Sequence, residues 1–126
     1  MKKELFAAIL LAALFFGALV NIRVLDSLGE SITAIVDDAE RAARSHDLDG
    51  AAQAAEDATR LWESRSGYTH LVLRHSVIED VSDKLGDLAK AAYAGNPGET
   101  VGAAKAARSR IESMASIERV RAGSIF

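Results

Sequence analysis

The sequence predicts an all-α fold in which an N-terminal transmembrane helix continues into a small antiparallel bundle of three to four helices. Three observations support this fold class. Residues 5–20 form an unbroken apolar run, and the apolar residues beyond it recur at steps of three and four. No alternating strand pattern competes with this helical period.

The apolar run follows Lys2 and Lys3 at the start of the chain. Its 16 residues make about 24 Å of helix, less than the roughly 30 Å hydrocarbon layer of a bilayer. Extension to Leu25 gives about 31 Å and places Arg23 where its guanidinium can reach the far headgroups. We interpret residues 1–25 as an uncleaved membrane anchor of the signal-anchor type and residues 26–126 as an extracytoplasmic helical bundle.

A cleaved secretory signal is the main alternative to this anchor, because such signals also begin with basic residues and an apolar core. However, residues 17–21 offer no A-x-A-like pair of small residues before a polar region. The chain also lacks the Cys that a lipoprotein needs. Because Lys2 and Lys3 precede the anchor and acidic residues follow Arg23, the positive-inside rule predicts a single-pass cell-membrane protein with a cytoplasmic N-terminus.

The charge of residues 26–126 narrows the range of partners. Without Lys2, Lys3, Arg23 and Glu4, the 15 basic and 18 acidic residues of the chain leave a formal net charge of about −5. This acidic balance disfavours nucleic acid as a partner. Alanine is abundant and aromatic residues are few in this part, so we expect close helix packing with modest stability.

The membrane helix is expected to run on into the first helix of the bundle. Apolar residues at helical spacing continue its stripe: Leu25, Leu28, Ile32, Ile35, Ala39 and Ala43. Gly29 is the only weak point in this rod, which should end near residues 45–50. There Asp47 is placed to cap the next helix.

Two further helices are expected before residue 94. The second carries Ala51, Ala54, Ala55, Ala58, Leu61 and Trp62, and a break or kink follows at residues 64–67. The third is expected to run without interruption to about Tyr93. Its predicted buried face consists of Leu71, His75, Ile78, Leu85, Leu88 and Ala92.

The turn at residues 94–99 is the clearest boundary in the chain. Gly95 can end one helix, Asn96 can cap the next, and Pro97 suits the first helical position. Glu99 then occupies the third helical position. The last helix is predicted to bury Val101, Ala104, Ala107, Ile111, Met114 and Ile117, and to fray over residues 119–126.

The titratable residues indicate no catalytic site. His75 and Glu79 are four residues apart on one helix face, a spacing that fits a metal-ligand or acid–base pair but also a structural histidine held by a carboxylate. The sequence has no phosphate loop, nucleophile elbow or zinc-binding pattern. We therefore expect no enzymatic activity, no metal, no cofactor and no small-molecule substrate.

One resemblance involves the same residues. The N-terminal membrane segment, the helix ending in Trp62, the spacing of 13 residues to His75, and the pair Ile78 and Glu79 resemble an uncharacterised bacterial membrane-anchored family, domain of unknown function 4363. The resemblance implies an anchor with a helical extracytoplasmic part and no established activity. We expect Trp62, His75 and Glu79 to form one cluster, with His75 packed beneath Trp62 and held by Glu79.

These features favour a non-enzymatic, membrane-anchored interaction module of the bacterial cell envelope that acts with another membrane or envelope protein. Self-association is possible through Ala13 and Gly17, a small-xxx-small pair in the membrane segment. One alternative is an extracytoplasmic sensor or metal-binding domain that uses His75 and nearby carboxylates. Another is a pilin-like filament subunit, although the pilin processing signature is absent.

Overall fold

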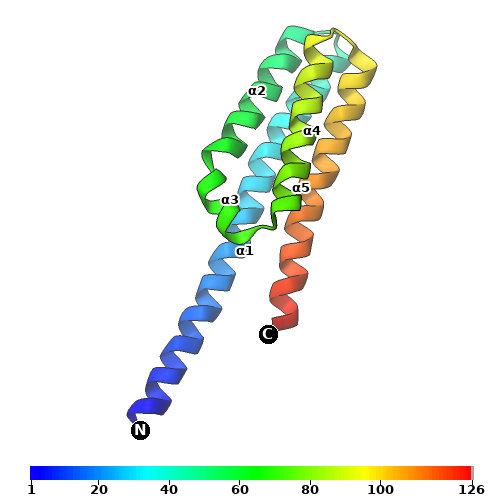
Figure 1. The fold of residues 1–126 in the computed structure, drawn as a ribbon. Coiled ribbons are helices and arrows are strands. Elements are labelled where there is room, and N and C mark those ends of the chain that lie inside the picture. The colour runs from blue at the N-terminus through cyan, green and yellow to red at the C-terminus, as the bar shows by residue number, and fades with distance from the viewer. Residues whose placement is uncertain (126) are drawn as a thin grey trace.

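The computed structural model describes the backbone of residues 1–125 and the side chains of residues 1–114 and Ser116. This part of the chain contains helices and no strand, so the prediction of an all-α fold is confirmed. Figure 1 shows its five helices: α1 (Lys2–Arg44), α2 (Leu48–Ser64), α3 (Ser66–Val72), α4 (His75–Tyr93) and α5 (Pro97–Ile125).

Four of these helices form the bundle. α1 and α4 each pack against both α2 and α5, while the short α3 connects α2 to α4 at the end where α1 leaves the bundle. The N-terminal half of α1 projects beyond that end, and the C-terminal part of α5 extends past the same end (Figure 1). The predicted continuity of the apolar segment with the first bundle helix is present in the 43-residue α1.

The core begins at Leu25, the first buried residue of α1. Further along the bundle, Trp62 of α2 and the leucines and isoleucines of α4 and α5 fill its centre. At the far end, a second cluster of buried residues consists of alanine alone: Ala43, Ala51, Ala52 and Ala92. Small side chains let these helix ends approach closely but remove little apolar area from water.

Both chain reversals at the far end use the same backbone design. His46 and Gly95 adopt left-handed conformations, with φ of 61° and 75° respectively. In each turn this residue donates its N–H to the carbonyl three residues back, and the next residue donates to the carbonyl five residues back, which is a Schellman motif. That next residue, Asp47 or Asn96, then caps the following helix by accepting from a backbone N–H.

The predicted third helix is wrong in one respect, because α3 and α4 are separate. Leu73 and Arg74 between them are extended, with ψ of 152° and 145°. Leu73 buries its side chain in the core through this conformation. Since two extended residues break the rotation of 100° per residue, the predicted face fails before the break: Leu71 is 84% exposed. His75, the first residue of α4, is exposed as well.

The rest of the predicted faces fit the structure more closely. Ile78, Leu85, Leu88 and Ala92 of α4 are buried as predicted, and so are Ala104, Ala107, Ile111 and Met114 of α5. Val101 is half-buried, and the side chain of Ile117 lies outside the described residues. Fraying is not seen over residues 119–125, because α5 continues to Ile125; Phe126 lies outside the described residues.

The two left-handed turn residues predict opposite effects of substitution. His46→Gly should raise the free energy of unfolding by about 0.5 kcal/mol, because glycine adopts positive φ without the steric cost of a Cβ. Gly95→Ala should lower it by about 1 kcal/mol for the same reason. Urea unfolding followed by circular dichroism measures both. If both substitutions changed the free energy of unfolding in the same direction, the left-handed conformation of these residues would not explain their effects.

Candidate functional site

The projecting half of α1 exposes a continuous apolar surface. It is long and apolar enough to cross a membrane, and its most apolar stretch has no buried residue. Large side chains that face outward include Leu5, Phe6, Ile9, Leu10, Leu11, Leu14, Phe16 and Val20. Ala13 and Gly17 lie on this segment, and a Cβ added at Gly17 would meet nothing within 4 Å. The small-xxx-small pair is therefore accessible to another helix.

The predicted cluster of Trp62, His75 and Glu79 is only partly brought together. His75 Nε2 lies 2.9 Å from Glu79 Oε1, but their side chains are 75% and 63% exposed. Trp62 is buried, and its indole N–H donates to Ser82 Oγ at 2.9 Å. The expected packing of His75 beneath Trp62 is wrong, because His75 is the first residue of α4 and its side chain is largely exposed, whereas Trp62 is buried.

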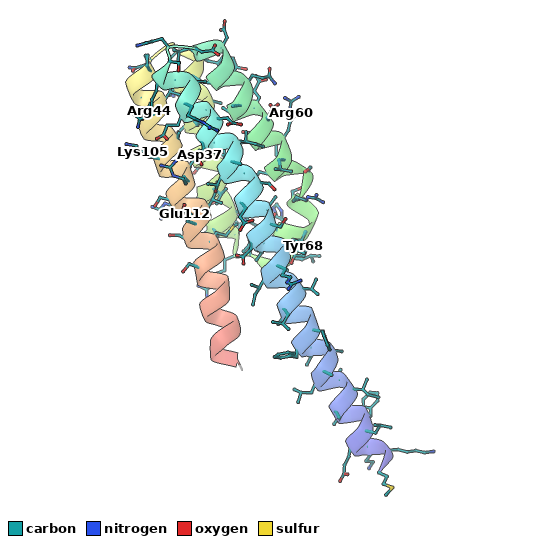
Figure 2. The ribbon with its side chains drawn as sticks, turned by 180° about the vertical axis from the view of Figure 1, so that it is seen from behind. Asp37, Arg44, Arg60, Tyr68, Lys105 and Glu112 are labelled. Atoms are coloured by element: carbon teal, nitrogen blue, oxygen red, sulfur yellow. The ribbon has the colours of Figure 1, made fainter. Side chains whose placement is uncertain are left out.

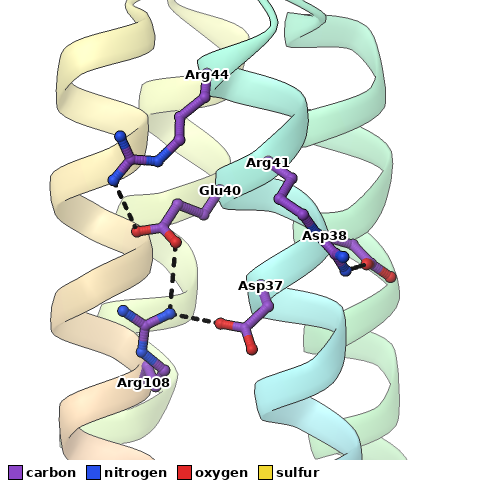
Figure 3. Close-up of polar contacts among 6 residues, drawn as sticks. All are labelled: Asp37, Asp38, Glu40, Arg41, Arg44 and Arg108. Atoms are coloured by element: carbon purple, nitrogen blue, oxygen red, sulfur yellow. Dashed lines mark hydrogen bonds and ion pairs between the residues drawn. The ribbon is translucent and has the colours of Figure 1, made fainter.

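A network of ion pairs that the sequence analysis did not anticipate joins α1 to α5. Arg108 of α5 places Nη1 2.5 Å from Asp37 Oδ1 and 3.6 Å from Glu40 Oε2 (Figure 3). Arg44 reaches the other oxygen of Glu40 at 3.6 Å. Asp37 and Arg108 are 71 residues apart in the chain, so only the tertiary fold brings them together.

The network stabilises the charged form of Arg108. The hydrogen bond to Asp37, followed by the charges of Asp37 and Glu40, raises the pKa of Arg108 above its ordinary value. A raised pKa in the folded state contributes stability at every pH below the ordinary value, and that contribution is lost only as the pH rises through the folded-state pKa. The contribution from this group is therefore constant across neutral pH.

An acidic groove of about 350 Å³ lies between α1 and α5, next to this network. Carboxylates of Asp26, Glu30, Asp37 and Glu112 line it together with small or apolar residues. At its base Gly29 allows close contact of the helices, since a Cβ there would lie 3.4 Å from Ile111 Cγ2. Gly29, predicted as a weak point of the rod, is in fact a buried contact with α5.

The three histidines belong to different elements of the structure, and His75 begins α4. His46 occupies the turn after α1, while His70 Nδ1 lies 2.7 Å from the Ser66 carbonyl oxygen within α3. Across the described part of the chain, no group of three or more His, Asp or Glu side chains is placed to hold a metal ion. The arrangement instead combines an apolar helix with an acidic surface immediately beyond it.

Comparison with protein-family models, with curated proteins and with solved structures gave no match to this chain. The resemblance to domain of unknown function 4363 therefore stays a prediction.

Removing Arg108 from the network should destabilise the bundle. Arg108→Leu takes this partner from Asp37 and Glu40, of which Glu40 is only 14% exposed, and should cost about 1–2 kcal/mol. Arg110→Leu, which breaks the more exposed pair with Asp80, should cost at most about 0.5 kcal/mol. Denaturant unfolding compares the two. A loss no greater for Arg108 than for Arg110 would show that the network adds nothing.

Trp62 and His75 should differ sharply in their effect on stability. Trp62→Phe removes buried area and the hydrogen bond to Ser82, so we expect a loss of about 1–2 kcal/mol. His75→Ala should stay within about 0.5 kcal/mol, since its side chain is mostly in water. Thermal unfolding of both variants tests the contrast. A large loss of stability for His75→Ala would instead indicate that this side chain contributes to the core, as the sequence analysis expected.

Proposed function

We propose that this protein is a non-enzymatic, membrane-anchored interaction module of the bacterial cell envelope. The observation that supports this proposal best is that α1 joins an apolar half, whose most apolar stretch has no buried residue, to a half that builds the core. The first half needs an apolar environment, and the second fixes a folded bundle at its end.

The exposed half of α1 is costly in water. Burial of one large aliphatic or aromatic side chain contributes about 1.5–3 kcal/mol, and many such residues face outward here. A helix satisfies its backbone hydrogen bonds internally, which suits it to a bilayer. We infer that lipid covers this segment, with Lys2 and Lys3 on the cytoplasmic side and the bundle outside.

The bundle then presents its acidic groove next to the membrane. Asp26 and Glu30 follow the apolar segment within two turns of α1, and Glu112 faces them from α5. Among these four groove carboxylates, Asp37 pairs with Arg108. A basic segment of another membrane or envelope protein has the complementary charge, and a partner anchored in the same bilayer would meet the groove at this height.

Two other functions use parts of the same structure. In a pilin-like subunit, the exposed half of α1 would pack against copies of itself in a filament core, and in a dimer Ala13 and Gly17 would do so within the bilayer. In a sensor or metal-binding domain, His75 and Glu79 would bind an ion at the surface. The acidic groove beside the anchor favours the interaction module over these two.

Single-cysteine variants can test anchorage, orientation and partner contact together, because the natural chain has no Cys. In intact cells, a membrane-impermeant thiol reagent should label Glu30→Cys in the groove and Asp87→Cys on α4, but not Lys3→Cys. A short bifunctional thiol-to-amine crosslinker should then join a basic membrane protein to Glu30→Cys and not to Asp87→Cys.

Each alternative gives a different result in that experiment. A labelled chain whose mass lacks residues 1–20 would overturn the anchor. If only Lys3→Cys were labelled, the N-terminus would lie outside the cell and the bundle inside, opposite to the proposed orientation. Crosslinked products that contain only this chain, and that Gly17→Ile abolishes, would support self-association in place of a separate partner.

A further inference from the structure

A second pocket lies on the other side of α1, where this helix meets α2 and α3. Its volume is about 500 Å³, and it is lined by Arg23, Val24, Ser27, Leu28, Ser31, Leu61, Arg65 and Tyr68. Arg23 and Val24 end the apolar segment of α1, so the pocket opens where the proposed anchor leaves the bilayer. The acidic residues of the groove take no part in its lining.

The two arginines of this pocket differ from most others in the bundle. Arg41, Arg44, Arg60, Arg108 and Arg110 all pair with carboxylates. Within the described residues, neither Arg23 nor Arg65 forms an ion pair, although the bundle carries an excess of acidic residues. Two arginines thus line one pocket that has no carboxylate among its lining residues.

The remaining lining residues suit a phosphate ester. Ser27 and Ser31 lie one turn apart on α1 and supply hydroxyl donors, while Val24, Leu28 and Leu61 supply apolar surface. Guanidinium and hydroxyl groups are preferred donors to phosphate oxygens. The apolar surface beside them fits the glycerol and upper acyl region of a lipid rather than a fully hydrated ion.

A contact at the mouth fixes the geometry of the pocket. The Tyr68 hydroxyl donates to the Asn21 side-chain carbonyl, which ties α3 to α1 at the point where the projecting segment begins (Figure 2). Arg65 lies one turn before Tyr68 and donates no side-chain hydrogen bond within the described residues. The connection between α2 and α3 therefore holds Arg65 near the same level of α1 as Arg23.

We propose that this pocket binds the phosphate of an anionic membrane phospholipid. The proposal rests on the membrane anchorage proposed above, because the bilayer supplies the ligand at the level of Arg23. Binding there would fix the height and the rotation of α1 in the membrane. A phosphate ester dissolved in water has the same charged group but lacks the acyl region that the apolar surface would contact.

The test uses the full chain in zwitterionic micelles, with the arginine side-chain Nε–H signals followed by NMR. Short-chain phosphatidylglycerol should shift the signals of Arg23 and Arg65 in a saturable way, whereas phosphatidylcholine and inorganic phosphate at equal concentration should not. The double variant Arg23→Gln with Arg65→Gln should bind phosphatidylglycerol about tenfold more weakly, judged from the amide signals of Ser27 and Ser31.

Arg74→Gln is the matched control. It removes one cation from the connection between α3 and α4, at the same end of the bundle but outside the pocket (Figure 1). Its affinity should remain within about twofold of the natural chain. A loss for Arg74→Gln equal to that of Arg23→Gln or of Arg65→Gln, each measured as a single variant, would show diffuse attraction to anionic lipid and overturn the pocket.

Two further outcomes would also overturn the proposal. Equal shifts with inorganic phosphate would identify a site for soluble phosphate, and unchanged signals with every probe would show that no anion binds. Anchorage is measured separately by thiol labelling in cells, so an anchored chain without preference for phosphatidylglycerol would refute this pocket alone.

Discussion

The backbone hydrogen bonds of α1 continue from Lys2 to Arg44, and the arrangement of the other helices depends on that continuity. A helix of 43 residues is about 65 Å long, and its buried residues, from Leu25 to Ala43, all lie in its second half. The residues change their role at Leu25, where exposed apolar side chains give way to buried ones. The same helix therefore provides both the exposed apolar segment and one wall of the core.

Packing against this wall is uneven along its length. Near the projecting segment, large side chains such as Leu25, Ile32 and Met114 fill the core, while the far end is closed by alanines and two tight turns. Between them the ion pairs of Arg108 link α5 to α1. Since alanines contribute little buried area, polar contacts and helix caps carry a larger share of stability at the far end.

Local signals in the sequence predicted much of this fold. Gly95, Asn96 and Pro97 marked a reversal through backbone conformation and capping, and Asp47 marked the other, because these effects involve residues close in the chain. The extended conformation of Leu73 had no such signal. Its burial depends on the contacts of the assembled core. His75, which the predicted stripe placed on the buried face, is exposed at the start of α4.

For the candidate sites too, the sequence predicted contacts within one helix but not contacts between helices. Sequence spacing correctly placed Glu79 beside His75, since both lie on one helix. It could not anticipate the contact of Trp62 with Ser82, the ion pair of Arg108 with Asp37, or the shared pocket of Arg23 and Arg65. Each of these joins residues from different helices, and their proximity follows from how the helices pack.

Because α1 is unbroken, the number of residues between its apolar segment and the bundle determines the direction in which the bundle faces. Each residue inserted between the apolar segment and Leu25 would turn the bundle by about 100° and raise it by about 1.5 Å relative to that segment. One added residue would thus point the acidic groove in a different direction relative to the apolar segment, whereas seven would return it nearly to its original direction. The length of this helix therefore determines the rotation of the bundle about the helix axis as well as its distance from the apolar segment.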